Sequence, residues 1–154
     1  MVLDENFKEF VKLLNANGVK YLVVGGFAVA YHGYPRYTKD IDFWIWAEIE
    51  NADKLLQTIQ EFGLSTIGIQ MEDLLDVNNV IQLGYEPNRI DLIMQLDGVD
   101  FNSCFEHRQA AVFEGIDIPF INLDDLIKNK LSTGRLKDKA DAQALERTRI
   151  KNKK

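Results

Sequence analysis

The stretch from residue 19 to residue 46 constrains the fold more than any other part of the chain. Its first part, VKYLVV, is a short apolar and β-branched run, which predicts a strand that stops at Gly25 and Gly26. FAVAYHGY then predicts a short helix that ends at a further glycine and a proline. The last part, DIDFWIW, alternates strictly, so one face of this strand belongs to the core and the other carries Asp40 and Asp42. We therefore expect a domain that combines a β-sheet with helices.

The rest of the chain supplies further elements of the same kind. Helical spacing of apolar residues and capping signals predict helices over residues 4–17, 51–62, 99–108 and about 123–134, and through LKDKADAQALERTR. NVIQLGYEPNRIDLIMQ predicts two strands joined by a turn at residues 86–88, and VFEGIDIPFI predicts one or two short strands. The fold class that follows is α+β or α/β, a small mixed β-sheet with helices packed on one face.

Length and composition favour one soluble domain that spans residues 1–154. The chain has 46% hydrophobic and 27% charged residues, which suits a single ordinary core. No apolar run approaches the roughly 20 residues that cross a bilayer, and MVLDENFKEF lacks the basic and apolar parts of a signal peptide. We therefore expect a cytoplasmic protein without a membrane partner. The single cysteine, Cys104, excludes an intrachain disulfide and a thiolate-rich zinc site.

Charge is distributed unevenly along the chain. Residues 1–120 carry 8 basic and 19 acidic side chains, whereas residues 121–154 carry 10 basic and 5 acidic ones. An acidic body argues against a protein that coats nucleic acid, but carboxylates brought together by folding suit a hard divalent cation, and the basic C-terminal helices, from about residue 123, could reach a phosphate. The alternative is two solvated faces of opposite sign.

Three acidic residues are candidates for a metal site. Asp40 and Asp42 lie two apart on a strand, so they point to the same side and repel each other unless a positive charge lies between them. In RIDLI, Asp91 shares a strand face with Arg89 and interrupts an otherwise apolar run. If Asp91 faces the same way as the other two, the three carboxylates form an oxygen-rich site for one or two Mg²⁺ ions. The alternative is a row of solvent-facing strand acids, which is common.

The glycine pair adds a candidate phosphate site. Gly25 and Gly26 lie between a strand and a helix, where missing side chains let backbone N–H groups approach a phosphate. The alternative is a simple tight turn, and the glycine motifs of Rossmann and Walker nucleotide sites are both absent. The combination of glycine pair and paired acids is what favours phosphate chemistry.

VGGFAVAYHGYPRYTKDID resembles the signature of the DNA polymerase beta-like nucleotidyltransferase superfamily, in which a Gly-Gly or Gly-Ser pair precedes a D-x-D strand by about a dozen residues. The resemblance is closest to small bacterial members, which include aminoglycoside nucleotidyltransferases and toxin-type members of toxin–antitoxin pairs. It implies that Gly25 and Gly26 contact nucleotide phosphates, that Asp40 and Asp42 bind metals, and that Asp91 completes the site and helps to activate the acceptor hydroxyl.

The resemblance is specific over residues 19–46 and becomes weaker beyond residue 94, although KNKLSTGRLKDKADAQAL looks like the basic C-terminal helices of the same small proteins. The chain lacks a helix-hairpin-helix DNA module and a separate substrate domain. Templated polymerisation is therefore not expected.

Other residues extend this candidate site. Arg36 could neutralise a triphosphate and Thr38 could bond one of its oxygens, unless both belong to an ordinary exposed loop. Lys130 is the best candidate among the C-terminal cations, with Arg135 and Lys137, for the leaving pyrophosphate, and solvation is the alternative for all three.

Two further pairs have structural interpretations. Asp138 and Asp141 are three apart on a helix and are expected to pair with nearby Lys or Arg residues. Trp44 and Trp46 could stack a base, although aromatic cover over a sheet is the commoner explanation.

Two functions stay open at this point. The first is a Mg²⁺-dependent nucleotidyltransferase that moves a nucleoside monophosphate from a nucleoside triphosphate to an acceptor hydroxyl and releases pyrophosphate. The acceptor would be an RNA end such as that of tRNA, a small molecule or a protein. The second is a non-catalytic member of the same fold that binds a nucleotide or a partner protein, such as a toxin–antitoxin component. The presence of all three acids favours the enzyme.

Overall fold

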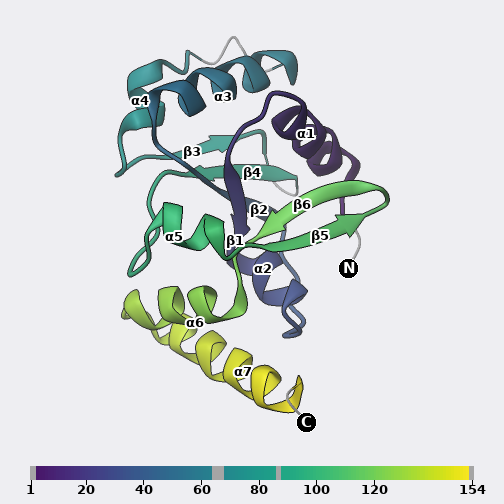
Figure 1. Ribbon diagram of the computed structural model, residues 1–154, viewed down its shortest axis with the longest axis vertical. Coiled ribbons are helices and arrows are strands. Elements are labelled where there is room, and N and C mark those ends of the chain that lie inside the picture. Colours follow the sequence, from purple (N-terminus) through teal and green to yellow (C-terminus); the bar gives the residue numbers. More distant parts are fainter. Residues whose placement is uncertain (1–2, 64–67, 86–87, 153–154) are drawn as a thin grey trace.

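The protein folds around one mixed β-sheet, as the computed structural model in Figure 1 shows. The structure describes residues 3–63, 68–85 and 88–152. Its strands are β1 (Tyr21–Val24), β2 (Asp40–Ile45), β3 (Val80–Leu83), β4 (Arg89–Ile93), β5 (Gln109–Phe113) and β6 (Ile116–Phe120). Its helices are α1 (Glu5–Ala16), α2 (Gly25–Tyr31), α3 (Ile49–Glu61), α4 (Met71–Leu75), α5 (Phe101–Glu106), α6 (Leu123–Ser132) and α7 (Leu136–Asn152).

The order of the six strands in the sheet is β3-β4-β2-β1-β6-β5. Strand β2 runs antiparallel to β1 and parallel to β4, and β1 runs parallel to β6. Hairpins of antiparallel strands, β3–β4 and β5–β6, close the two edges. The α+β class and the mixed sheet predicted from the sequence are confirmed.

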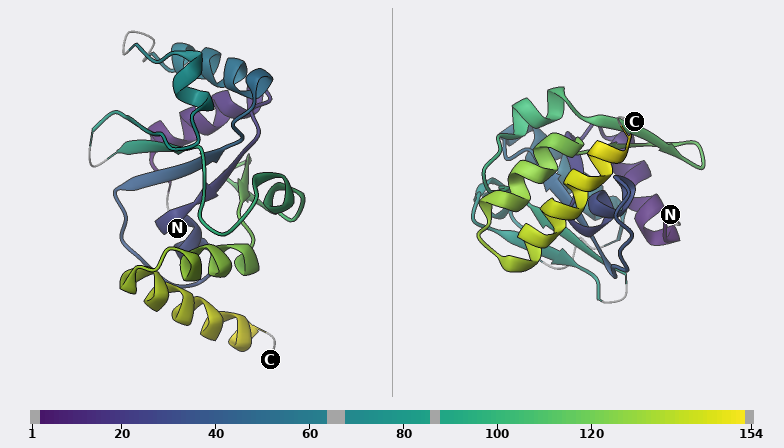
Figure 2. Two further views of the ribbon diagram at one scale, coloured as in Figure 1. Left: turned by 90° about the vertical axis from the view of Figure 1, so that its left-hand side faces the viewer. Right: turned by 90° about the horizontal axis from the view of Figure 1, so that it is seen from below.

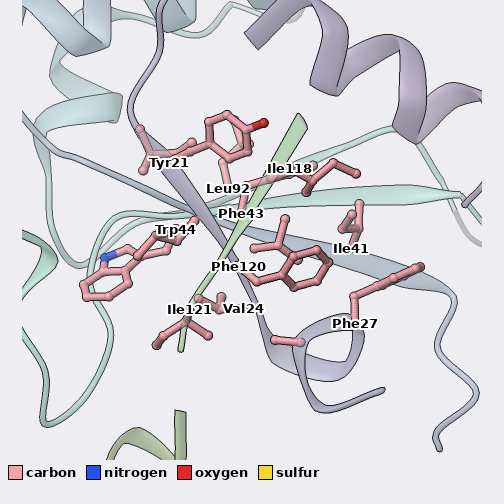
Figure 3. Packing of buried hydrophobic residues seen from close by; sticks show 14 of the residues in the cluster. Tyr21, Val24, Phe27, Ile41, Phe43, Trp44, Leu92, Ile118, Phe120 and Ile121 are labelled. Atoms are coloured by element: carbon pink, nitrogen blue, oxygen red, sulfur yellow. The ribbon is translucent and has the colours of Figure 1, made fainter. Parts of the chain in front are cut away.

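One face of the sheet packs against α1 and α3, which lie side by side in Figure 1. Phe10 of α1 is fully buried, and its ring centroid lies 5.5 Å from that of Phe43 in β2 and 5.1 Å from that of Phe62 at the end of α3. Figure 3 shows side chains of neighbouring strands meeting in the core, among them Phe43 and Leu92. Replacing a buried phenylalanine such as Phe10 by alanine typically costs about 3–5 kcal/mol.

The opposite face of β2 is covered in part by α5. Trp44 is buried, and its ring meets that of Phe101 edge to face at 5.1 Å. Trp46 stacks on the same phenylalanine at 6.4 Å. Both tryptophans thus pack against α5, as their interpretation as aromatic cover over the sheet predicted.

Helices α6 and α7 lie together across the lower end of the molecule, beyond α2, as both views of Figure 2 show. Asn122 caps α6 by accepting a hydrogen bond from the backbone N–H of Asp125, as its position in the sequence predicted. None of the helices in the described ranges is long and apolar enough to cross a membrane.

Most element boundaries agree with the sequence, with two differences. Helix α2 begins at Gly25 rather than after the glycine pair, so both glycines belong to its first turn. The short helix α4 lies within residues 63–78, for which the sequence predicted nothing. The predicted turn at residues 86–88 lies largely outside the described residues.

Candidate active site

Three carboxylates lie on one face of the sheet at the centre of the molecule. Strands β2 and β4 are parallel neighbours, and Asp42 lies directly opposite Asp91, so the two side chains emerge on the same side. Asp40 shares that side because it lies two residues before Asp42. Asp91 is only 8% exposed, whereas the other two are half-buried.

Arg89 binds two of these acids and was not singled out from the sequence. Its Nη2 donates to Asp40 Oδ2 at 2.7 Å, and its Nε and Nη2 donate to the two oxygens of Asp91 at 2.9 and 3.1 Å. The available signal was the alternation of RIDLI, which places Arg89 and Asp91 on one strand face. We call Asp40, Asp42, Asp91 and Arg89 the carboxylate cluster.

The negative charge of this cluster exceeds its positive charge. Burial is the largest of the causes that raise the pKa of Asp42 to about 7, and the charge of Asp91, a hydrogen bond with Asp91 and the charge of Asp40 contribute to the same rise. Lys130 acts in the opposite direction. The ionised form of Asp42 is therefore disfavoured until further positive charge is bound beside it.

The cluster has suitable ligands for a divalent cation but is not arranged around one. As the side chains stand, no three carboxylate, imidazole or thiol groups in the described part of the chain converge on a point where a metal ion would fit. Three acids nevertheless offer the oxygen ligands that Mg²⁺ prefers, and their mutual repulsion calls for positive charge. The three acids fit a divalent cation if Arg89 releases Asp40 or Asp91.

The two glycines allow close packing at the start of α2. Gly25 has a φ of +66°, and a Cβ atom there would lie 2.0 Å from Asp42 Oδ2. A Cβ at Gly26 would lie 3.2 Å from Thr38 Cβ. The absence of a side chain thus lets Asp42 approach the backbone at Gly25, while the space beside Gly26 is filled by Thr38.

Thr38 and Arg36 are engaged within the protein. The hydroxyl of Thr38 donates to the backbone oxygen of Asp40 at 2.9 Å, which fixes the segment that leads into β2. Arg36 Nη1 donates to Asp141 Oδ2 of α7 at 2.5 Å. The segment around these residues is therefore tied to both the sheet and the last helix, and its interpretation as an ordinary exposed loop is wrong for these two side chains.

Lys130 is buried, so its interpretation as a solvated lysine is wrong. It is 9% exposed, and its Nζ lies 3.0 Å from Asp138 Oδ1 and 3.3 Å from Asp141 Oδ2. Arg135 Nε also pairs with Asp138 at 2.8 Å, although the Arg135 side chain is largely exposed. The predicted pairing of Asp138 and Asp141 with nearby cations is confirmed.

We call this second group the cationic cluster: Arg36, Lys130, Arg135, Asp138 and Asp141. It contains three cations and two acids, and both acids are buried. Asp141 contacts both Arg36 and Lys130, two candidate phosphate-binding residues that are far apart in the sequence. Lys137 is exposed and does not belong to this group.

A pocket of about 240 Å³ connects the two clusters. Its lining includes Gly25 and Asp42 from the sheet side of the molecule and Lys130, Arg135 and Asp138 from α6, α7 and their connection. The pocket therefore combines carboxylate and cationic groups, which is a suitable setting for a phosphate ester and its counter-ion.

Comparisons with known proteins identify the family and the fold. A family model described as "Nucleotidyltransferase of unknown function (DUF6036)" matches residues 1–149. No curated protein sequence matches the chain.

Solved structures of three proteins share the fold. TM1012 of Thermotoga maritima, provisionally assigned as a nucleotidyltransferase, has a TM-score of 0.62 at 16% identity over 96% of this chain and 91% of its own. The lincosamide antibiotic adenylyltransferase LnuA, bound to lincomycin, has a TM-score of 0.60 at 17% identity over 94% and 97%. An antigenic nucleotidyltransferase-like protein of Paracoccidioides brasiliensis has a TM-score of 0.53 at 13% identity over 92% and 72%. Since the family model covers nearly the whole chain, the protein belongs to the DUF6036 family of nucleotidyltransferases and has the fold of polymerase beta-like members.

Proposed function

We propose that the protein transfers a nucleoside monophosphate from a nucleoside triphosphate to an acceptor hydroxyl and releases pyrophosphate. The observation that carries this proposal is the pocket between the carboxylate cluster and the cationic cluster, which both Asp42 and Lys130 line. A triphosphate with its divalent counter-ion carries both charges that such a pocket would bind.

In the proposed reaction, the acceptor oxygen attacks the α-phosphorus in line with the leaving pyrophosphate. Asp91 helps to activate the hydroxyl, as the family resemblance implies. Lys130 and Arg135 line the pocket and would bind the phosphate oxygens as negative charge develops on pyrophosphate. The family resemblance implies phosphate contacts for Gly25 and Gly26; of the two, Gly25 lines the pocket beside Asp42, whereas Thr38 fills the space beside Gly26.

Asp40, Asp42 and Asp91 would hold the magnesium, as one or two ions. When bound, Mg²⁺ would neutralise phosphate charge and stabilise the attacking and leaving oxygens. The chain's own contribution is to place three carboxylates on one sheet face and to keep Arg89 beside them.

A second candidate function is supported by Arg89. Because its guanidinium already binds Asp40 and Asp91, the same fold could bind a nucleotide or a partner protein without catalysis, as a toxin–antitoxin component would. This second function requires that Arg89 stay bound to Asp40 and Asp91 when a triphosphate is present.

The test combines binding with transfer. The pure protein is incubated with each labelled triphosphate, Mg²⁺ and a total cell extract, and label is followed into acceptors. Mg²⁺ with the correct triphosphate should also raise the melting temperature by mass action. If no common triphosphate raises the melting temperature, nucleotide binding is excluded. If the melting temperature rises but no acceptor is labelled, the non-catalytic binder is favoured.

A further inference from the structure

Strand β5 forms one edge of the sheet, and one side of its backbone has no neighbouring strand. In the described part of the chain it pairs only with β6, the strand that follows it. The hairpin of these two strands projects from the body of the molecule in Figure 1 and in the right-hand view of Figure 2. An edge of this kind offers main-chain donors and acceptors to a further strand.

The sequence of β5, QAAVF, has none of the features that usually keep a sheet edge from pairing. It contains no charged residue and no proline, and its register with β6 is unbroken over the whole strand. Val112 is 66% exposed and lies on the same strand face as Ala110, which is also exposed. The edge thus presents apolar side chains as well as backbone groups.

The turn of the hairpin indicates which backbone groups of β5 face outwards. Glu114 and Gly115 have positive φ angles of 52° and 80°, as in a two-residue type I′ turn. The residues on either side of such a turn form a hydrogen-bonded pair, and these pairs alternate with non-hydrogen-bonded ones along the ladder. Counting back from Phe113, we infer that Ala110 and Val112 direct their N–H and C=O groups away from β6.

Charged residues of opposite sign flank the strand. Arg108 precedes β5 and Glu114 follows it, both are exposed, and both are three residues from Ala111 at the centre of the strand. When two copies of β5 run antiparallel about a two-fold axis at Ala111, Arg108 of each copy lies opposite Glu114 of the other. The same register places Ala110 opposite Val112, so outward-facing backbone groups meet each other.

We propose that two copies of this chain associate through β5, antiparallel and in the register centred on Ala111, and form one continuous sheet across the dimer. Opposite charges that face each other across two strands stabilise the pairing, whereas like charges oppose it. A two-fold axis at Ala110 or at Val112 would also match the backbone groups, but it would separate Arg108 from Glu114. The charges therefore select one register.

The other edge of the sheet, β3, is not self-complementary in this way. The charged residues nearest to its two ends in the sequence are Asp76 and Glu86, so antiparallel pairing of two copies would bring like charges together. Strands β6 and β1 lie between β5 and β2, so the two copies meet away from the strands that carry the carboxylate cluster. The inference is therefore independent of the proposed function.

Sedimentation equilibrium of the full chain over a range of concentrations measures the association. We expect a monomer–dimer equilibrium with a Kd on the order of 10 µM, because the contact is short. Ala110→Pro should abolish the dimer, because it removes an outward N–H group that the monomer does not use, and edge strands tolerate proline at such positions. A monomer at every concentration, or a dimer that Ala110→Pro leaves unchanged, would overturn the proposal.

Charge reversal tests the register. Arg108→Glu and Glu114→Arg should each raise the Kd about tenfold, because both charge pairs of the dimer become repulsive. The first variant is acidic at both ends of the strand and the second is basic at both, so a one-to-one mixture should associate with nearly wild-type affinity. Arg147→Glu, at an exposed arginine of α7, is the control and should not change the Kd. A mixture that associates no better than the single variants would overturn the register.

Disulfide formation gives a second measurement, which leaves the ion pair of Glu114 with Lys8 intact. In the proposed register the two copies of Ala111 form a non-hydrogen-bonded pair with Cα atoms about 4.5 Å apart, within reach of a disulfide. Ala111→Cys should therefore form a covalent dimer on mild oxidation. Val112→Cys should not, because the two copies of Val112 are two residues out of register. The wild type, with only the buried Cys104, shows the background. Equal cross-linking of the two variants, or none in either, would contradict the proposed pairing.

Discussion

The carboxylate cluster and the cationic cluster differ in charge balance, and the difference indicates what binds between them. The first has three acids for one arginine, and the second has three cations for two acids. Each cluster thus lacks the charge that the other has in excess, although the two line one pocket through Asp42 and Lys130. A divalent cation would complete the first and a polyphosphate the second.

The clusters also differ in burial. Asp138, Asp141 and Lys130 are each at most 9% exposed; in the carboxylate cluster Asp91 is buried as well, but the side chains of Asp40 and Arg89 are 24% exposed. A buried ion pair is costly to break because the remaining charge has no water to replace its partner. We therefore expect substitutions in the carboxylate cluster to affect mainly function, and substitutions in the cationic cluster to affect stability as well.

The largest expected effect comes from Asp42→Asn. Loss of this proposed metal ligand should lower the rate of transfer about a thousandfold. The protein without ligands should become no less stable, because repulsion with Asp40 and Asp91 is relieved. Label transfer and melting temperature, with and without Mg²⁺ and triphosphate, measure the two effects. The variant should lose most of the ligand-dependent gain in melting temperature. A large loss of stability in the absence of ligands would show that Asp42 is a structural residue.

In the cationic cluster, Lys130→Met should destabilise the fold by about 3 kcal/mol, because it leaves Asp138 and Asp141 buried with less positive charge. Urea unfolding measures this change. The double variant Lys130→Met with Asp141→Asn should recover part of the loss, since it removes one of the two acids that have each lost a cation and keep only one, Arg135 or Arg36. A cost below about 1 kcal/mol, typical of surface pairs, would contradict the distinction between the clusters.

Arg89→Gln sharpens the charge comparison. With the guanidinium gone from Asp40 and Asp91, we expect the affinity for Mg²⁺ in the absence of triphosphate to rise about tenfold. Titration calorimetry measures the affinity, and Arg108→Gln, at an exposed arginine near α5, is the control. Weaker binding in Arg89→Gln would mean that the arginine orients the acids for the metal and does not compete with it.

The sequence predicted the carboxylate cluster better than the cationic cluster. Alternation along a strand is a local property, so the shared side of Asp40 and Asp42 followed directly from their spacing. The position of Asp91 required only that its strand pair with theirs in register, which the structure confirms. Phosphate and metal contacts of these residues stay predictions.

The contacts of the cationic cluster depend on tertiary packing and could not be derived in the same way. Arg36 and Asp141 are 105 residues apart, and their pairing exists only because α7 packs next to the segment before β2. Lys130 lies in a polar stretch that reads as a solvated helix, and its burial results from the crossing of α6 and α7. The pocket between the two clusters depends on the same packing, because its lining comes from separate parts of the chain.

The smallest expected effect tests how Asp138 is stabilised. Burial by itself would raise the pKa of this carboxyl, but hydrogen bonds from Thr133 and Lys130 and the charges of Lys130 and Arg135 hold it below its ordinary value. The folded protein therefore binds this proton less readily than the unfolded chain. The resulting stability is fully present above the unfolded pKa of about 3.8 and is lost as the pH falls through the folded value.

Thr133→Val removes the hydroxyl that donates to Asp138 Oδ2 at 2.8 Å and keeps the shape of the side chain. We expect it to cost about 1 kcal/mol at neutral pH and to raise the pKa of Asp138 towards its ordinary value, because one bond to the ionised form is gone. Chemical denaturation at a series of pH values between neutral and strongly acidic measures both effects. The difference in the free energy of unfolding between wild type and variant should shrink as the pH falls below the folded pKa of Asp138. The hydrogen bond from Thr133 stabilises a protonated carboxyl less than an ionised one, so its removal then costs less. A difference that stays constant down to acidic pH would assign the cost to packing around Thr133 and would leave Lys130 and Arg135 as the groups that hold the pKa of Asp138 low.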